Sequence, residues 1–231
     1  LGLETFQRYR EGDSVYIGPD GALTRFTGEI FPVAPETERE MTRLIDLLDT
    51  LVAQVDADTP WTHPDAEALD RISFEAWLAE QTSDQEARDN IALFVAGAML
   101  TKPPHAFSTL QALLMAASAG SFSNLVDADF ILDARVVGGL QKVPLGLAAR
   151  LGDDVLLEQP VRTIEWSDDG VTAITDDVTV HARHAILAVP PVLYSRISFV
   201  PALPRRQQQL HQHLSMGFVI KVHAVYDRPF W

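Results

Sequence analysis

The sequence of 231 residues contains no cysteine, which excludes disulfides, thiolate metal ligands and a cysteinyl bond to a cofactor within this stretch. Positive charge is scarce as well, with 18 Lys and Arg against 32 Asp and Glu and a formal net charge of −14. Nucleic acids and anionic membrane surfaces bind clustered positive charge, so neither is expected as a partner. The acidic excess favours cationic ligands such as amines, although surface acids serve solubility more often.

Long apolar runs are also missing. The longest, Ile91–Leu100 and Leu110–Ala117, fall short of the roughly 18–20 residues that a membrane span requires. We see no secretory signal and expect a cytoplasmic location. The chain begins with Leu1 rather than Met and stops directly after an apolar stretch, so we expect an internal part of a longer protein.

Several motifs of catalytic chemistry are absent. No Ser occupies a G-x-S-x-G elbow, and no His pair has convincing metal-ligand spacing on a helix. The acidic pairs Asp168-Asp169 and Asp176-Asp177 are read as turns, so no metal site is expected. The G-x-G-x-x-G turn that holds a dinucleotide pyrophosphate is missing from this chain.

The chain does contain clear helical patterns. From Glu36 to Val55, apolar residues recur at the i, i+3, i+4, i+7 spacing of an amphipathic helix. Another helix is predicted from a cap at Ser73 to about Glu80. Ser83 and Glu86 have capping-box spacing and should open the next helix. A mostly apolar helix from about Phe107 to Ala117 should be largely buried, and a short helix is expected from Arg205 to Leu214.

Strand patterns occur near both ends of the chain. Ser14–Gly18 and Leu23–Phe26, joined by turn residues, predict a hairpin. A meander is predicted farther on, and a buried strand His184–Val189 should end at Pro190-Pro191. The predicted meander strands are Val161–Trp166, Val171–Thr175 and Val178–Val180.

The last stretch, Phe218 to Tyr226, alternates like a strand and is apolar on both faces, which is typical of burial on both sides. Lys221 in its middle is out of place, because an unpaired buried ammonium is costly. Two interpretations stay open. The stem extends and puts the charge at a sheet edge, or Lys221 is desolvated and faces a cavity where its chemistry matters.

Several motifs keep one order along the chain. Val136-Val137-Gly138-Gly139 is followed by a helical run and a Leu-Gly-Asp turn, and an apolar strand later stops at Pro190-Pro191. Gly217, three residues, Lys221 and an apolar strand then lead to Pro229-Phe230-Trp231. In this order and spacing the chain resembles the flavin-dependent amine oxidases, the group of monoamine, putrescine and polyamine oxidases and L-amino-acid oxidases.

The resemblance implies roles for individual residues. Lys221 matches the lysine that holds a water against the flavin ring in that family. Val161 corresponds to a residue that contacts the adenosine half of FAD through its backbone, and Ala188 and Pro190 fall at a turn near the cofactor. Leu125 and Leu132 align with residues lining the substrate passage; the alternative is that both are core residues.

The resemblance also implies a fold and an activity. We expect an α+β substrate-binding domain, with helices on a mixed sheet, over residues 1–136 and 211–231. Part of a Rossmann-like FAD-binding α/β domain interrupts it over residues 137–210. The expected reaction oxidises a small-molecule amine to an imine and reduces oxygen to hydrogen peroxide. An L-amino-acid oxidase or related flavin oxidoreductase, or a module inactive by itself, are the alternatives, and a homodimer is left open.

Overall fold

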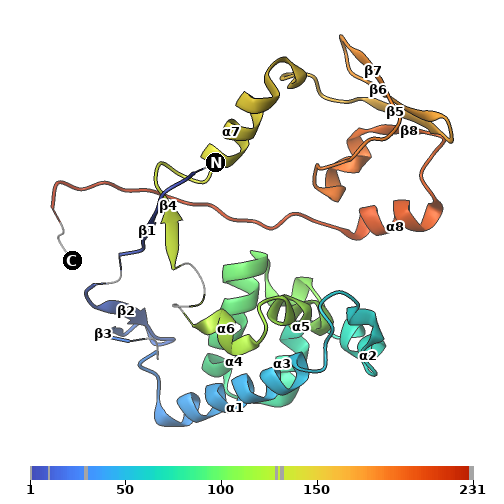
Figure 1. The fold of residues 1–231 in the computed structure, drawn as a ribbon. Coiled ribbons are helices and arrows are strands. Elements are labelled where there is room, and N and C mark those ends of the chain that lie inside the picture. Colours follow the sequence, from blue (N-terminus) through green and yellow to red (C-terminus); the bar gives the residue numbers. More distant parts are fainter. Residues whose placement is uncertain (1, 10, 29–30, 128–129, 131–132, 229–231) are drawn as a thin grey trace. The chain divides into compact units, whose positions relative to one another are not determined.

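The computed structural model describes residues 2–9, 11–28, 31–127, 130 and 133–228 (Figure 1). The chain divides into two compact units. The first, called the helical unit, combines Gly2–Leu140 with Gly217–Trp231, and the second, called the sheet unit, is Gln141–Met216.

The predicted helices form in the helical unit, with shifted ends. Its α-helices are α1 (Pro35–Val52), α2 (Ala66–Arg71), α3 (Phe74–Gln81), α4 (Gln85–Ala92), α5 (Thr109–Ser118) and α6 (Phe122–Val126). Two 3₁₀ turns, η1 (Pro60–Thr62) and η3 (Pro104–Ala106), join them, and a π-helix, η2 (Leu93–Leu100), continues directly from α4. The wide π-helical turn was not predicted, because its residues are apolar on every side.

Helix starts follow side-chain caps. Ser73 Oγ accepts a hydrogen bond from the Ala76 N–H at 3.2 Å, which confirms the predicted cap of α3. The predicted capping box at Ser83 is wrong, because Asp84 caps α4 and accepts from the Ala87 N–H at 3.0 Å. The buried Thr37 hydroxyl donates to the other carboxylate oxygen of Asp84 at 2.8 Å and so joins the first turn of α1 to α4.

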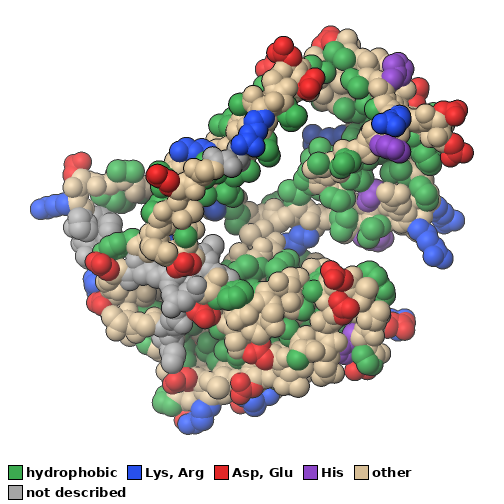
Figure 2. Space-filling view, in the orientation of Figure 1, with side chains coloured by type: hydrophobic (Ala, Val, Ile, Leu, Met, Phe, Trp, Pro, Cys, Tyr) green, Lys and Arg blue, Asp and Glu red, His purple; other side chains and the backbone are tan. Residues whose placement is uncertain are grey.

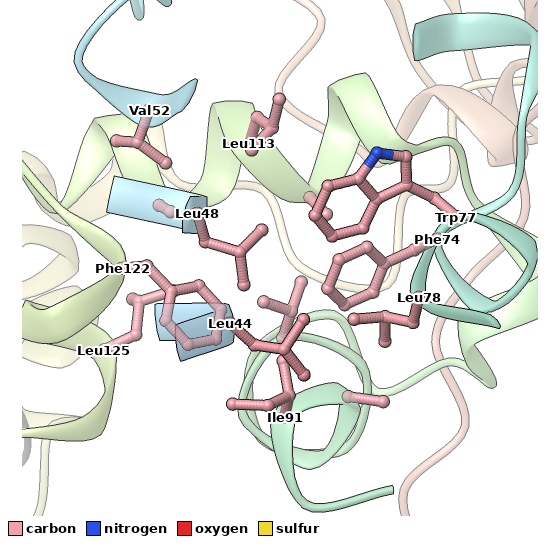
Figure 3. Packing of buried hydrophobic residues seen from close by; sticks show 14 of the residues in the cluster. Leu44, Leu48, Val52, Phe74, Trp77, Leu78, Ile91, Leu113, Phe122 and Leu125 are labelled. Atoms are coloured by element: carbon pink, nitrogen blue, oxygen red, sulfur yellow. The ribbon is translucent and has the colours of Figure 1, made fainter. Parts of the chain in front are cut away.

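One hydrophobic core holds these helices together (Figure 3). Leu44 and Leu48, one turn apart on α1, are fully buried and face Phe122 and Leu125 of α6. Phe74 of α3 stacks on Trp77 with ring centroids 6.2 Å apart and an interplanar angle of 10°. Asp49 of α1 binds the first turn of α6. Its carboxylate accepts hydrogen bonds from the Phe122 N–H at 2.6 Å and from the Ser123 N–H at 3.1 Å.

Short strands complete the helical unit. The predicted hairpin is confirmed as β2 (Ser14–Ile17) and β3 (Leu23–Phe26), an antiparallel pair with Ser14 opposite Phe26. A second antiparallel pair joins β1 (Thr5–Gln7) to β4 (Ala134–Val136). The mixed sheet expected beneath the helices is therefore not formed in the helical unit, whose described residues give only these two separate two-stranded sheets.

The sheet unit contains a mixed four-stranded sheet with the order β7-β6-β5-β8. Its strands are β5 (Thr163–Ser167), β6 (Gly170–Ile174), β7 (Thr179–Ala182) and β8 (Ser198–Val200). The antiparallel pairs β5–β6 and β6–β7 confirm the predicted meander, whereas β8 runs parallel to β5. Two α-helices, α7 (Lys142–Leu151) and α8 (Arg205–His213), and two 3₁₀ turns, η4 (Gly152–Asp154) and η5 (Pro191–Arg196), belong to this unit.

The predicted strand His184–Val189 is wrong. The described chain has no strand there, and Ile186 is 94% exposed. The apolar pattern alone could not decide this, because a strand also needs a neighbour for its backbone N–H and C=O groups. Hydrophobic side chains are visible on the surface of the sheet unit in Figure 2, and Ile164 is the one buried hydrophobic side chain among its described residues.

Candidate functional site

The segment that carries Lys221 runs without helix or strand, so the predicted strand Phe218–Tyr226 is wrong for this chain (Figure 1). Its side chains are exposed, with Phe218 at 84%, Ile220 at 93% and Val225 at 95%. Burial on both faces requires flanking strands, and the structure, where it describes the chain, pairs no strand with this segment. Lys221 is exposed and lines neither of the two cavities of the structure. The interpretation in which its ammonium group faces a cavity is therefore not supported by the structure of this chain.

A cavity of about 740 Å³ lies within the helical unit, between the β2–β3 hairpin, the start of α1 and η2. An aromatic cluster forms part of its wall. Phe31 stacks on Phe94 of η2 with ring centroids 6.1 Å apart, and Phe26 of β3 meets Phe31 edge-on at 6.2 Å. Met41 and Ile45 of α1 add apolar surface to the same wall.

The polar part of this lining is mostly acidic. Glu11, Asp13 and Glu38 contribute carboxylates, and Arg8 is the one basic residue among the described lining residues. Aromatic faces and carboxylates both attract organic cations, so this cavity is chemically suited to an alkylammonium group. Sequence reasoning missed these residues, because Phe94 belongs to an apolar helical run and Glu38 is one of several charged residues on a predicted amphipathic helix.

A polar cluster supports the aromatic wall from behind. Tyr16 stacks on Phe31 at 5.5 Å and donates its hydroxyl hydrogen to Glu86 Oε1 at 2.7 Å, while the Asn90 amide donates to the Tyr16 hydroxyl at 3.3 Å. Partial burial is the main cause that raises the pKa of Tyr16, and the Asn90 hydrogen bond opposes it. Tyr16 therefore stays protonated at neutral pH and acts as a fixed donor that orients the aromatic wall.

The three predicted cofactor residues lie in the sheet unit. Val161 is half-buried and directly precedes the first sheet hydrogen bond, which the Arg162 N–H donates to Ile174 O at 2.8 Å. Ala188 and Pro190 are exposed, on the stretch before η5. The small side chain of Ala188 permits close approach of a ligand, and a contact through the backbone needs no polar side chain. The residue types at Val161, Ala188 and Pro190 therefore suit the expected FAD contacts, which stay predictions.

Of the two predicted substrate residues, the structure describes Leu125, which lines neither cavity. Leu125 is 3% exposed and packs in the core of the helical unit, which supports the alternative interpretation that it is a core residue. Leu132 lies outside the described residues, as do Pro229, Phe230 and Trp231.

A second cavity of about 410 Å³ lies within the sheet unit, where η5 faces α8. Tyr194 meets the His211 ring edge-on at 4.8 Å, and the Tyr194 hydroxyl donates to Leu187 O at 3.2 Å. Through the described part of the chain, no helix is long and apolar enough to cross a membrane, and no cluster of three or more His, Asp or Glu is arranged to bind a metal.

Comparison with known proteins gives one consistent result. The sequence model of the family described as flavin containing amine oxidoreductase matches residues 1–231. Putrescine oxidase of Kocuria rosea is 59% identical, with 100% of this chain and 51% of that protein covered. Amine oxidase [flavin-containing] A of Canis lupus familiaris is 31% identical, with 100% and 44% covered.

Solved structures agree with this result. Wild-type putrescine oxidase bound to putrescine matches with a TM-score of 0.95 and 61% identity, covering 100% of this chain and 51% of that one. Cyclohexylamine oxidase from Brevibacterium oxydans matches with a TM-score of 0.82 and 31% identity, covering 91% and 47%. The chain spans about half the length of the curated relatives it matches.

Proposed function

The chain belongs to the flavin containing amine oxidoreductase family, and we propose that its protein is an FAD-dependent oxidase of small aliphatic amines. The observation that carries this proposal is the 59% identity to a putrescine oxidase along the whole chain. That relative's name points to a short diamine as the substrate class. The product is an imine, which water converts to an aldehyde and ammonia.

FAD, when bound, supplies the redox chemistry by taking a hydride from the carbon that bears the neutral amine and reducing oxygen to hydrogen peroxide. In this proposal the sheet unit holds part of the FAD-binding domain and contacts the cofactor at Val161, Ala188 and Pro190. The chain contains no G-x-G-x-x-G turn, so the proposal assigns none of its residues to the pyrophosphate. The finer domain limits, 1–136, 137–210 and 211–231, are part of the same proposal.

Lys221 is proposed to hold a water beside the cofactor. An ammonium has three N–H donors and no acceptor, so it can fix a water through the water's oxygen. In the complete protein, Lys221→Met should slow reoxidation by oxygen strongly while FAD stays bound. Stopped-flow absorbance of the reduced protein mixed with oxygen measures this rate, and a wild-type rate in the variant removes Lys221 from the mechanism.

The acidic, aromatic cavity of the helical unit is proposed to receive the substrate as a cation. Glu38→Gln should then raise KM for a diamine and leave kcat unchanged, because the charge acts before the chemical step. Glu75→Gln, an exposed acid on α3 outside the cavity lining, is the matched control. Equal KM values in both variants would contradict this use of the cavity. Substrate contacts at Leu125 and Leu132 stay predictions.

An L-amino-acid oxidase is the competing activity, and it requires an arginine for the substrate carboxylate. Arg162 is engaged with Asp176 in an exposed pair at 2.9 Å, and Arg135 is exposed on β4. Neither lines the two cavities, which favours amines over amino acids. Peroxide release by the full-length protein with mono-, di- and polyamines and amino acids tests this, and turnover of amino acids alone would overturn the proposal.

The remaining alternative concerns residues 1–231 by themselves. Mixed with FAD, this chain should cause no shift of the flavin spectrum, because the pyrophosphate turn is absent from it. A tight complex would show that the chain binds the cofactor without that turn. A homodimer, which the sequence leaves open, is tested by size measurements. A cytoplasmic location, which is expected from the sequence, stays a prediction for cell fractionation.

A further inference from the structure

The π-helix η2 ends at a residue with an unusual backbone conformation. Thr101 has φ 52° and ψ 38°, in the left-handed region, and is one of two residues other than glycine with a positive φ in the described chain. A β-branched residue is strained there, so the surrounding structure must hold it. Its own N–H and that of Lys102 both donate to Ala96 O, which closes the end of the helix.

This conformation turns the Thr101 carbonyl away from the helix axis. Instead of continuing the helical ladder, Thr101 O accepts a hydrogen bond from the Phe218 N–H at 2.8 Å. The two residues belong to the same unit although they are far apart in sequence. The strained residue therefore has a structural use, since it attaches the start of the segment that carries Lys221.

Gly217 lies against the same place. A Cβ added to Gly217 would overlap Thr101 Oγ1 and approach Leu100 O to 2.9 Å, closer than real Cβ atoms come to backbone oxygen. The constraint is space rather than φ, because Gly217 is not among the glycines with positive φ. Gly217 is the one glycine between Val171 and Trp231. It is therefore the one residue of that stretch that can lie against Thr101 without a Cβ.

A single allowed residue at this position fixes the register of everything after it. In the described chain this segment pairs with no strand, so the alternation of faces applies only where it is extended, as its apolar pattern predicts; there, a slip by one residue would turn Lys221 to the other side. Lys221 follows Phe218 by three residues, about 10 Å at the rise of an extended chain. Because the attachment precedes Lys221 so closely, it keeps the backbone of Lys221 within about 10 Å of the Phe218 amide.

We propose that Thr101 and Gly217 form a register anchor that positions Lys221. They are positioning residues, because they act through the backbone that carries Lys221 rather than by touching substrate or cofactor. The expected effect of the anchor on reoxidation rests on the proposed role of Lys221. The contact between Thr101 and Gly217 does not depend on that role. Gly217→Ala should displace the segment, and Thr101→Gly in addition should restore part of the position by removing the side chain that the new methyl meets.

The anchor is tested first without reference to activity, by amide hydrogen exchange in the complete protein with bound FAD. Gly217→Ala should speed exchange at the Phe218 amide about fivefold, the change expected for losing one hydrogen bond of ordinary net strength. Gly97→Ala is the matched control, because its methyl meets only the movable end of Leu93. Unchanged Phe218 exchange in Gly217→Ala would overturn the proposal.

The link to Lys221 is tested by the rate of reoxidation. Gly217→Ala should slow reoxidation by oxygen about tenfold while the anaerobic reduction rate and the FAD content stay at wild-type values. The double variant Gly217→Ala, Lys221→Met should be no slower than Lys221→Met alone, because both changes act through one group. Multiplied effects would show that Gly217 acts independently of Lys221 and would overturn the positioning role.

These results separate the two proposals. If Lys221→Met reoxidises at the wild-type rate but Gly217→Ala still exposes the Phe218 amide, the role of Lys221 fails and the anchor stands. If Lys221→Met is slow but Gly217→Ala leaves both readouts unchanged, the anchor fails and the role of Lys221 stands.

Discussion

The two units differ in how much of their apolar surface they bury themselves. In the helical unit, a continuous core gathers residues from every α-helix, and Leu44, Phe74, Ile91 and Val95 are completely inaccessible. In the sheet unit, only Ile164 is buried among the described hydrophobic side chains, while Leu157 is 78% and Ile186 is 94% exposed. The α-helices of the first unit are stabilised by their own packing. The second unit exposes much of its apolar surface, as does the segment after Gly217 in the first unit.

This difference is informative about function. Large exposed apolar side chains mark places where a protein meets other chain segments or ligands. Relatives of this chain are about twice as long, and the proposed cofactor contacts Val161, Ala188 and Pro190 all lie in the sheet unit. The unit with the poorer core is thus the one expected to gain most from further chain and from FAD. Substitutions in the two units should therefore differ in their effect on stability.

The largest effect is expected in the helical core. Phe74→Ala should cost about 3–5 kcal/mol of unfolding free energy, because it removes a fully buried ring that stacks on Trp77 and Phe107. Urea denaturation measures this cost, and hydrogen exchange should show protection lost in the helical unit first. Leu157→Ala, at an exposed position, is the control and should stay within about 0.5 kcal/mol of the parent. Equal losses in both would contradict the contrast.

A smaller effect is expected in the sheet unit. Ile164→Ala should cost about 2 kcal/mol, the low end for such truncations, because few buried neighbours surround it. Exchange of the β5 and β6 amides reports the change, with Val180→Ala as the exposed control. A loss as large as that of Phe74→Ala would show that the sheet has a better core than the contrast allows.

Loss of a helix cap should follow. Asp84→Ala removes the acceptor of the Ala87 N–H and the partner of Thr37, at an expected cost of about 1 kcal/mol. Ser83→Ala is the matched control, one residue earlier, and should change little because Ser83 does not cap α4. Thermal melts of both variants measure the effect. A larger fall in Tm for Ser83→Ala than for Asp84→Ala would support the capping box at Ser83 that the sequence suggested.

The same carboxylate gives a pH dependence. Hydrogen bonds, first that from the Ala87 N–H, lower the pKa of Asp84 in the folded chain. The stabilisation from Asp84 is therefore complete above its unfolded pKa and is lost as pH falls through that value toward the folded pKa. Asp84→Asn should flatten the acid limb of a plot of Tm against pH between about pH 6 and pH 2. An unchanged slope would assign acid sensitivity to other carboxyls.

The smallest effect is expected from the exposed pair of Arg162 and Asp176. The Arg162 guanidinium lowers the pKa of Asp176 by hydrogen bonding, but both side chains are more than half exposed. Such pairs are screened by water and salt. Asp176→Asn should shift Tm slightly at low salt and not measurably at high salt, and a shift that persists in high salt would show that the pair matters to the sheet unit.

Local patterns predicted much of the fold. The α1 helix, the cap at Ser73, the β2–β3 hairpin and the β5–β6–β7 meander all follow from periodicity and turn residues within a few positions. Ser83 and Asp84 are both favourable caps by residue type, and the hydrogen bond from Thr37, 47 residues away, is a contact of Asp84 that a local pattern cannot show. The strands at His184–Val189 and Phe218–Tyr226 failed for the same kind of reason, since strand formation depends on a distant neighbour.

The candidate site was predicted less well. Lys221 was singled out because a charge stands out in an apolar run within a short, ordered family motif, and its role at a site stays a prediction. The acidic, aromatic cavity was not found, because Phe31, Phe94 and Glu38 come from separate elements and look ordinary in each. The anchor at Thr101 was hidden as well, because nothing in the sequence signals a left-handed threonine or the space taken by its hydroxyl.

The contact between Asp49 and the start of α6 has a consequence for synthesis on the ribosome. The N–H groups that Asp49 accepts belong to Phe122 and Ser123, 73 and 74 residues later in the chain. Their synthesis takes roughly 4–15 s after that of Asp49 at translation rates of about 5–20 residues per second. Until then the apolar side of α1 has no final docking surface, and the nascent chain is open to chaperones and aggregation. Slow codons before this point would lengthen that window, and fast ones would shorten it.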